Sequence, residues 1–463
     1  MEHSEKTNTI VIGAGITGLV TAFYLQQRGI DCVVIERQNQ VGGVMQTKKE
    51  AGFMYEAGPN TGVLGNPEVV ELFEDLGYTD HLEIADKKAK KRYVLKNDTW
   101  HPLPSGPIDG IKTHLFSWKD KFRMIGEPFR KPGKNPDERL HEMVIRRLGK
   151  SFLDYAVDPF ILGIYAGDPG YLVPKYALPK LYNLEQQYGS FIKGAIHKAK
   201  ERKRDPRLQK ASREIFSVYG GLSQLTNKLY NRIGQENFRL GAQDVTVDRY
   251  ENSYIIAYKN STENTCTIQA DNVITTTGAY EIPYLMPFLP QTYTQKISNL
   301  LYAKVIHVSV WFTNWRGMNL DAFGGLIPSK ENHDILGILF LSSFLTNRAP
   351  ESGALLSVFL GGVRRPEIIE KDDNEILQIV KSEVSQLLQI PDFNPDLLKI
   401  NRYTHAIPQY GIESADRYQA IEKIHEQYPG LMIGGNGIGG IGIADRIKQG
   451  KDLAFAINQL SNQ

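Results

Sequence analysis

The chain has 463 residues, 41% of them hydrophobic, which is enough for two or three domains with buried cores. Its formal net charge is only +2, so no overall electrostatic field favours a nucleic-acid partner. The two cysteines exclude a disulfide-rich scaffold, and no cysteine or histidine cluster has metal-ligand spacing. We therefore expect a protein of a reducing compartment, with no metal and no nucleic-acid partner.

The sequence predicts neither a signal peptide nor a transmembrane helix. Residues 1–9 are polar and lack the basic start and long apolar core of a signal peptide. Residues 335–347 are uncharged but too short to span a bilayer, and residues 427–444 are interrupted by glycines and a proline. We expect a cytoplasmic protein.

Hydrophobic periodicity predicts a βαβ unit at the start of the chain, with a strand at 9–12, a helix at 16–28 and a second strand at 32–36. Residues 102–200 follow a mostly helical pattern, in which aromatic side chains are interleaved with lysines and arginines. This segment predicts a separate helical lobe, and the basic run at 193–213 predicts an exposed linker.

The rest of the chain predicts a second α/β lobe, followed by a closing strand, turn and helix. β-rich segments, which suggest an antiparallel sheet in that lobe, occur at 244–258, 265–276, 304–313, 335–340 and 355–360. Near the end, a short strand at 431–433 precedes a glycine-dense loop and a helix at 442–459.

Gly13, Gly15 and Gly18 form a GxGxxG pattern between the first predicted strand and helix. Glycines at this spacing permit a tight turn, close approach of a dinucleotide pyrophosphate and packing of the helix on the strand. Glu36 ends the second strand, where its carboxylate can accept hydrogen bonds from both ribose hydroxyls. A purely structural turn and a solvated glutamate are the alternatives.

A second glycine pair favours FAD over NAD as the cofactor. Arg37 follows Glu36, and Gly42 and Gly43 then allow the backbone to approach the ribityl and pyrophosphate groups. This pattern resembles the glutathione-reductase-like flavoproteins. The resemblance implies that Glu56–Asn60 lies along the flavin and that the backbone of Val245 meets adenine, although Val245 fits a core position equally well.

The loop at 434–442 is denser in glycine than one tight turn requires. Amides at the start of the following helix can lie beside the flavin pyrimidine edge and stabilise the anion of reduced flavin. The predicted FAD-binding residues are Gly13, Ala14, Gly15, Ile16, Thr17, Gly18, Glu36, Arg37, Gly42, Gly43, Val44, Gly58, Pro59, Asn60, Thr61, Val245, Gly435, Asn436, Ile441, Gly442 and Ile443.

Over nearly its whole length the sequence resembles the oxygen-dependent protoporphyrinogen and coproporphyrinogen oxidases. The stretches that carry the resemblance are Lys91–Tyr93 with Pro104–Asp109, Asp158–Pro169, Leu184–Ser190 and Ala406–Tyr410. The GxYAGDP core of the second stretch is the most diagnostic. The resemblance implies an α/β fold, with a Rossmann-type FAD-binding domain of glutathione-reductase-like and amine-oxidase-like form, a mixed-sheet substrate domain and a helical lobe.

The expected domain boundaries follow from this resemblance. The FAD-binding domain would take residues 1–87, 213–285 and 405–463, the substrate domain 88–103, 200–212 and 286–404, and the helical domain 104–199. The resemblance also implies that the helical domain faces a membrane, although aromatic residues at helical spacing are more often core. The resemblance is also compatible with a homodimer and with transfer of the product to a ferrochelatase.

The chemistry implied is hydride transfer from a porphyrinogen carbon to flavin N5, with O2 as acceptor and H2O2 as product, in haem biosynthesis. None of the diagnostic stretches has an obvious catalytic acid or base, so no catalytic side chain is predicted. Arg92 would bind a substrate propionate. The residues that would line the macrocycle cavity are Gly163, Leu326, Leu339 and Phe359. Without the resemblance, Arg92 fits a solvent-exposed basic run and the others fit core packing.

Several alternatives stay open. Extra cavity cations would favour coproporphyrinogen, which has more carboxylates than protoporphyrinogen, and Lys91, Lys330 and Arg348 are candidates. Ile438 stands where many relatives place a basic residue. The rival functions are those of an amine oxidase or carotenoid desaturase, and a flavin-binding scaffold without turnover.

Overall fold

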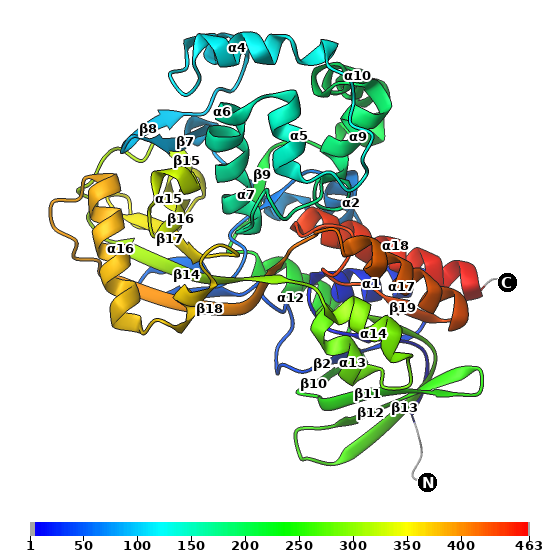
Figure 1. Ribbon diagram of the computed structural model, residues 1–463. Coiled ribbons are helices and arrows are strands. Elements are labelled where there is room, and N and C mark those ends of the chain that lie inside the picture. Colours follow the sequence, from blue (N-terminus) through cyan, green and yellow to red (C-terminus); the bar gives the residue numbers. More distant parts are fainter. Residues whose placement is uncertain (1–4, 462–463) are drawn as a thin grey trace.

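The computed structural model describes residues 5–461 and contains two large sheets (Figure 1). The first sheet has the order β10-β2-β1-β13-β12-β11, with β19 paired to β13. Strands β10, β2, β1, β13 and β19 run parallel, whereas β12 is antiparallel to both β13 and β11. The bounds are β1 Glu5–Ile12, β2 Cys32–Glu36, β10 Phe238–Leu240, β11 Gln243–Tyr250, β12 Ser253–Lys259, β13 Thr265–Thr275 and β19 Leu431–Ile433.

Helices cover both faces of the first sheet, which explains why the residues at the end of β1, Ile10–Ile12, are all apolar. Val11 packs in a core with α1 (Ile16–Gln26), α12 (Ser223–Ile233), α2 (Pro67–Asp75) and α18 (Ile443–Ser461). Ile10 and Ile12 face the opposite core, to which α13 (Ile282–Leu285), α14 (Gln291–Ser298) and α17 (Ser414–Gln427) contribute.

The predicted βαβ unit and the closing strand and helix are confirmed, with small differences in their bounds. β1 begins at Glu5 rather than at residue 9, and α18 runs from Ile443 to Ser461. The first helix ends at Gln26 rather than Arg28. Gly29 follows with a φ of 74°, a conformation that glycine adopts readily and that cannot continue a right-handed helix.

The second sheet has the order β18-β14-β17-β16-β15-β7-β8. It is mixed, because β7 pairs parallel with β15 while the other pairs are antiparallel. Helix α16 (Asp373–Leu388) packs on one face, where Ile376 and Val380 join the apolar core. The bounds are β7 Lys91–Lys96, β8 Thr99–Pro102, β14 Tyr302–Phe312, β15 Ala322–Leu326, β16 Ile335–Phe340, β17 Ala354–Gly361 and β18 Leu397–Pro408.

The prediction that all the β-rich segments after residue 243 belong to one antiparallel sheet is wrong. Residues 244–258 and 265–276 form β11, β12 and β13 of the first sheet instead. β13 is long enough to pair with β12 over residues 265–270, with β1 over residues 268–275 and with β19 over residues 273–275. Alternation in a sequence identifies a strand but not its partners.

The two smaller sheets are β3 (Thr47–Glu50) with β4 (Phe53–Glu56), and β5 (Gly62–Val63) with β9 (Ile215–Val218) and β6 (Leu82–Ile84). The strands of the first large sheet thus come from residues 5–36, 238–275 and 431–433, and those of the second from 91–102 and 302–408. The domain boundaries drawn from the sequence stay a prediction.

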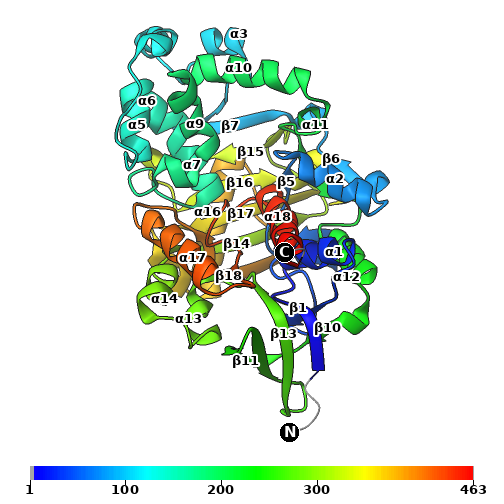
Figure 2. The ribbon, with the colours of Figure 1, turned by 90° about the vertical axis from the view of Figure 1, so that its right-hand side faces the viewer.

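The helical lobe, residues 107–204, lies at the end of the molecule farthest from the N-terminus (Figures 1 and 2). Its helices are α3 Pro107–Lys112, α4 Trp118–Ile125, α5 Leu140–Arg147, α6 Lys150–Phe152, α7 Asp158–Tyr165, α8 Pro174–Ala177, α9 Pro179–Tyr188 and α10 Phe191–Arg204. Among residues 5–461, no helix has the length and apolar character needed to cross a bilayer.

The linker predicted at 193–213 is wrong, because most of it is helical. α10 extends to Arg204, and α11 follows at Pro206–Gln209. The Ser190 side chain caps α10 by accepting a hydrogen bond from the Lys193 amide at 3.2 Å. The alanines, lysines and arginines that follow have high helix propensity, so a basic run can be an exposed helix as readily as a linker.

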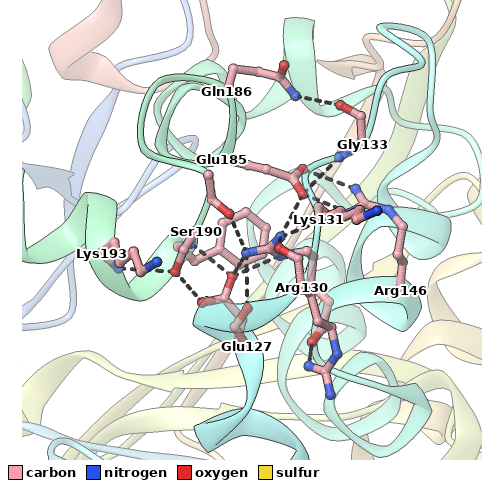
Figure 3. Close-up of polar contacts among 12 residues, drawn as sticks. Glu127, Arg130, Lys131, Gly133, Arg146, Glu185, Gln186, Ser190 and Lys193 are labelled. Atoms are coloured by element: carbon pink, nitrogen blue, oxygen red, sulfur yellow. Dashed lines mark hydrogen bonds and ion pairs between the residues drawn. The ribbon is translucent and has the colours of Figure 1, made fainter.

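A buried cluster of charged residues links several segments of the helical lobe (Figure 3). Arg147 and Glu127 are fully buried and form an ion pair, and Arg147 also lies 3.2 Å from Glu185. Glu127 accepts hydrogen bonds from the Ser190 hydroxyl at 2.6 Å and from the Phe191 amide at 3.0 Å. The Glu127 carboxylate thereby joins α5 to the start of α10, and Arg147 joins α5 to α9 through Glu185.

Candidate active site

The turn between β1 and α1 leaves an open space above Gly15. A Cβ atom at Gly18 would lie 1.9 Å from the Gly13 carbonyl oxygen, so this position requires glycine. A Cβ at Gly15 would meet no atom within 4 Å. The neighbours Ala14, Ile16 and Thr17 are buried. An open space in front of the first amides of a helix fits a diphosphate group.

Glu36 lies beside this turn at the end of β2. One carboxylate oxygen accepts a hydrogen bond from the Ala14 amide at 2.7 Å, and the other from the Gln38 amide at 2.8 Å. Each oxygen keeps a second lone pair that a ribose hydroxyl can use. Arg37 points elsewhere and forms an exposed ion pair with Glu281.

A second turn, at Gly42 and Gly43, packs against the turn between β1 and α1. The Gly42 amide donates to the Ala14 carbonyl at 2.8 Å, and a Cβ at Gly43 would lie 3.3 Å from the Gly15 Cα. Gly42 has a φ of 103°. A Cβ at Gly58 would lie 2.0 Å from the Val44 carbonyl oxygen, so the loop after β4 can approach this turn only with glycine there.

Beyond Gly58, the loop of Pro59, Asn60 and Thr61 reaches the second sheet. The Ser357 hydroxyl on β17 donates to the Asn60 side-chain oxygen at 3.0 Å, and His307 Nε2 lies 2.9 Å from the same hydroxyl. Because the single hydroxyl hydrogen goes to Asn60, the serine accepts from His307, which therefore carries its proton on Nε2. Burial lowers the pKa of His307 to about 4, so the imidazole is neutral.

Val245 lies on β11 where the pairing with β12 is irregular. The register shifts between Gln243 and Thr246, so Asp244 and Val245 fall outside the ladder. Asp244 has a φ of 51°. The Val245 backbone is therefore displaced from regular pairing, as contact with adenine would require, while its side chain packs partly against the core.

Three buried side chains donate hydrogen bonds to the carbonyls of the C-terminal glycine loop, residues 434–442. The Tyr410 hydroxyl lies 2.6 Å from the Asn436 carbonyl and 3.0 Å from the Gly440 carbonyl. Arg417 and Arg446 donate to other carbonyls of the loop. Gly435, Ile441, Gly442 and Ile443 complete the loop and the start of α18, which packs along α1.

The predicted macrocycle residues lie in two neighbouring rows on one face of the second sheet. Strand register places Phe359 opposite His307 and Gly337, and Gly337 opposite Leu326. In the next row, Leu339 is opposite Ser357 and Gly324, and Gly324 is opposite Arg92. These rows put the following residues on the same face: Arg92, Leu326, Leu339, Phe359, His307 and Ser357.

Gly163 of α7 covers this face from the helical lobe. A Cβ at Gly163 would lie 2.5 Å from Leu326 Cδ2. Leu326, Leu339 and Phe359 are only partly buried, although most residues around them in the sheet are fully buried. The face therefore presents apolar side chains beside the loop of Asn60.

Of the cations considered for substrate binding, only Arg92 lacks an acidic partner among residues 5–461. Its guanidinium carbon lies 5.7 Å from the centre of the Phe323 ring. Lys91 pairs with Asp321 at 2.5 Å, and Lys330 lies 3.7 Å from Asp154. Arg348 is fully buried and pairs with Glu56 at the end of β4 and with Glu83 in β6, so it ties these two strands to the segment that precedes β17.

The sequence comparisons agree with this geometry. The profile of the flavin-containing amine oxidoreductases matches residues 16–457. The chain is 30% identical to protoporphyrinogen oxidase 2 of Arabidopsis thaliana, over 95% of this chain and 91% of that protein. The chain belongs to the porphyrinogen oxidase family of flavin-containing amine oxidoreductases.

Another relative and a solved structure are similar over nearly their whole lengths. Coproporphyrinogen III oxidase of Bacillus subtilis is 27% identical, over 96% of this chain and 97% of that protein. Among solved structures, a candidate protoporphyrinogen oxidase from Exiguobacterium sp. 255-15 has a TM-score of 0.80 at 21% identity and covers 100% of both chains. This likeness confirms the fold.

As a member of this family, the protein is an oxidoreductase that binds FAD. The open turn above Gly15 fits the diphosphate and Glu36 fits a ribose. The sequence did not identify His307, Ser357 or Tyr410 as part of the site. His307 and Ser357 lie outside the motifs, and Tyr410 ends the Ala406–Tyr410 stretch, to which no role was assigned. The place of each residue depends on contacts between distant segments.

Proposed function

We propose that this protein oxidises protoporphyrinogen IX to protoporphyrin IX in haem biosynthesis, with O2 as the final acceptor and H2O2 as product. The observation that supports this most is the apolar face of the second sheet, which has Arg92 at one end and contacts the FAD-side loop through Asn60. A flat, mostly apolar macrocycle with anionic propionates matches such a face.

FAD supplies the oxidation when bound, by accepting a hydride at N5. The residues of the chain position the substrate and exclude water. Leu326, Leu339 and Phe359 pack against the macrocycle, and Arg92 holds a propionate by two parallel hydrogen bonds. The hydrogen bond from the Ser357 hydroxyl fixes the orientation of the Asn60 side-chain amide. The nitrogen of this amide donates to no described residue, so it can donate to the cofactor or the substrate.

The pairing of the cations favours protoporphyrinogen over coproporphyrinogen. Coproporphyrinogen has additional carboxylates that need cations of their own. Lys91 and Lys330 already lie against aspartates, and Arg348 is enclosed by two glutamates. Of these four cations, Arg92 alone has no acidic partner within residues 5–461, which suits the substrate with fewer carboxylates.

The experiment that tests substrate binding compares Arg92→Ala with Lys91→Ala in steady-state porphyrin formation. Loss of a charged hydrogen-bonded pair costs about 1.5–3 kcal/mol, so Arg92→Ala should lower kcat/KM about 10- to 150-fold, mainly through KM. Lys91→Ala should leave kcat/KM close to that of the wild type. Equal effects of the two changes would contradict the role of Arg92, and faster turnover of coproporphyrinogen would contradict the choice of substrate.

We also propose that the helical lobe contacts a membrane surface, which would give access to a poorly soluble substrate. The exposed apolar side chains on its outer helices are Ile108, Ile111, Trp118, Phe122, Ile125 and Phe129, of which Phe129 is 88% exposed. Lysines and arginines lie between them. Sedimentation with anionic vesicles should fall when Phe122 and Phe129 are changed to Ser. Equal sedimentation of wild type and variant would contradict this contact.

A further inference from the structure

Two buried arginines lie under the C-terminal glycine loop without a carboxylate partner. Arg417 on α17 is 0% exposed and Arg446 on α18 is 6% exposed. Neither forms an ion pair within residues 5–461, whereas Arg147 and Arg348, which are equally buried, each pair with a glutamate. Removing a guanidinium from water costs several kcal/mol unless a countercharge compensates for it.

The surroundings of these arginines offset only part of that cost. The Arg417 guanidinium lies 5.9 Å from the centre of the Tyr410 ring. Arg417 Nη1 and Arg446 Nε are buried and have no hydrogen-bond partner. Burial lowers the pKa of Arg446. The positive charge under the loop is therefore still not neutralised.

The hydrogen bonds that the arginines do make orient the peptides of the loop. Arg446 donates to the Gly435 carbonyl and, at 2.8 Å, to the Ile438 carbonyl. Arg417 Nε donates to the Gly437 carbonyl at 3.1 Å. Together with Tyr410, these side chains draw the loop carbonyls towards the buried charges.

The amides of the same peptides point the other way. Within a peptide, the N–H lies opposite the carbonyl of the preceding residue. The amides of Asn436, Gly437, Ile438 and Ile441 have no hydrogen-bond acceptor among the described residues. A run of free amides with two cations behind it is an electrostatic arrangement that binds an anion.

We propose that Arg417 and Arg446 are positioning residues for the flavin: they orient the loop amides and supply positive charge that stabilises an anionic pyrimidine edge in reduced FAD. The side chains of the loop itself supply no charge, since residue 438 is isoleucine. The two arginines would thus set how readily the flavin accepts electrons. This inference depends on FAD binding and not on which substrate is oxidised.

The test uses purified holoprotein with Arg417→Met and Arg446→Met made separately. Sulfite is the probe, because it adds to flavin N5 and leaves negative charge at the pyrimidine edge. Each substitution should weaken sulfite binding about tenfold or more and make the flavin midpoint potential more negative. Arg402→Met is the matched control, because Arg402 is paired with Asp373 at 2.5 Å in the second sheet, and it should change neither value.

A variant that retains FAD with unchanged sulfite affinity and midpoint potential would overturn the proposal, as would a wild-type protein that binds no sulfite. If a methionine variant does not fold or loses FAD, the same measurements on Arg417→Lys and Arg446→Lys test the proposal, because lysine keeps the positive charge. Near wild-type sulfite affinity in the lysine variants supports the proposal, and a tenfold loss in them overturns it. Neither measurement needs a porphyrinogen, so failure of the proposed substrate would not affect this test.

Discussion

Gly15 is the residue at which an added side chain would obstruct cofactor binding without disturbing the fold. A Cβ there meets nothing within 4 Å, and its φ of −70° suits any residue. We predict that Gly15→Val folds with an unchanged melting temperature of the apoprotein but binds FAD at least about 100-fold more weakly, since it fills the space of the diphosphate. Gly110→Val, also in open space, is the control and should retain FAD. Wild-type FAD affinity of Gly15→Val, measured by flavin fluorescence, would place the diphosphate elsewhere.

His307 predicts a specific pH dependence of stability. Its pKa falls from 6.5 to about 4 because of burial, so the unfolded chain takes up the proton first as pH falls. Its contribution to stability is complete above pH 6.5 and is lost as pH falls towards 4, by about 2 kcal/mol at pH 5. Chemical denaturation of the wild type should therefore lose more stability between pH 7 and pH 5 than that of His307→Gln. Equal losses would show that His307 is not held neutral.

At the residue scale, the sequence predicts best those positions that the backbone geometry requires. Gly13 and Gly18 would collide with the protein if they carried a side chain, and such a constraint appears as a motif. Arg417 and Arg446 could not be found in this way. Arg417 lies in an ordinary helix pattern, and only the folded chain shows that it lies beneath a loop formed some twenty residues later.

At the scale of elements, the buried cluster around Glu127 should control the stability of the helical lobe. Hydrogen bonds from Ser190 and Arg147 outweigh the effect of burial and lower the pKa of Glu127, so the carboxylate is charged. Glu127→Gln leaves Arg147 with a weaker partner, and we predict a loss of about 3 kcal/mol in the local stability of residues 107–204. Hydrogen exchange read by mass spectrometry should show faster exchange in α5, α9 and α10, with the first sheet unchanged.

Glu201→Gln is the matched control for this prediction. Glu201 pairs with Lys198 on the surface of α10, where an ion pair contributes little to stability. It should leave hydrogen exchange unchanged. If Glu127→Gln behaves in the same way, the buried cluster does not hold the lobe together.

Helices and strands were predicted well where the hydrophobic periodicity was strong. They were predicted poorly where the prediction depended on amino-acid composition alone. The strand at 32–36 and the closing helix follow apolar patterns that packing reinforces. The basic run at 193–213 has few apolar residues, so only helix propensity and the cap at Ser190 could have indicated α10. Partners of β-rich segments could not be assigned, because β13 joins strands far apart in the sequence.

At the scale of the whole molecule, the candidate site lies where three parts of the chain meet. The first sheet supplies the turn at Gly15, the second supplies the apolar face, and the helical lobe supplies Gly163. Arg348, buried against Glu56 and Glu83, and Asn60, bonded to Ser357, join the FAD side to the second sheet. No local pattern encodes such contacts, so the resemblance to a family supplied this part of the prediction.

The most direct test of the proposed function is to mix the FAD-loaded protein with protoporphyrinogen IX in the absence of oxygen and to follow flavin absorbance and porphyrin fluorescence together. We predict rapid loss of the oxidised flavin spectrum with formation of porphyrin, and recovery of that spectrum with release of H2O2 when air is admitted. If the flavin stays oxidised with both protoporphyrinogen and coproporphyrinogen, the protein does not oxidise porphyrinogens, and the apolar face of the second sheet binds a different substrate.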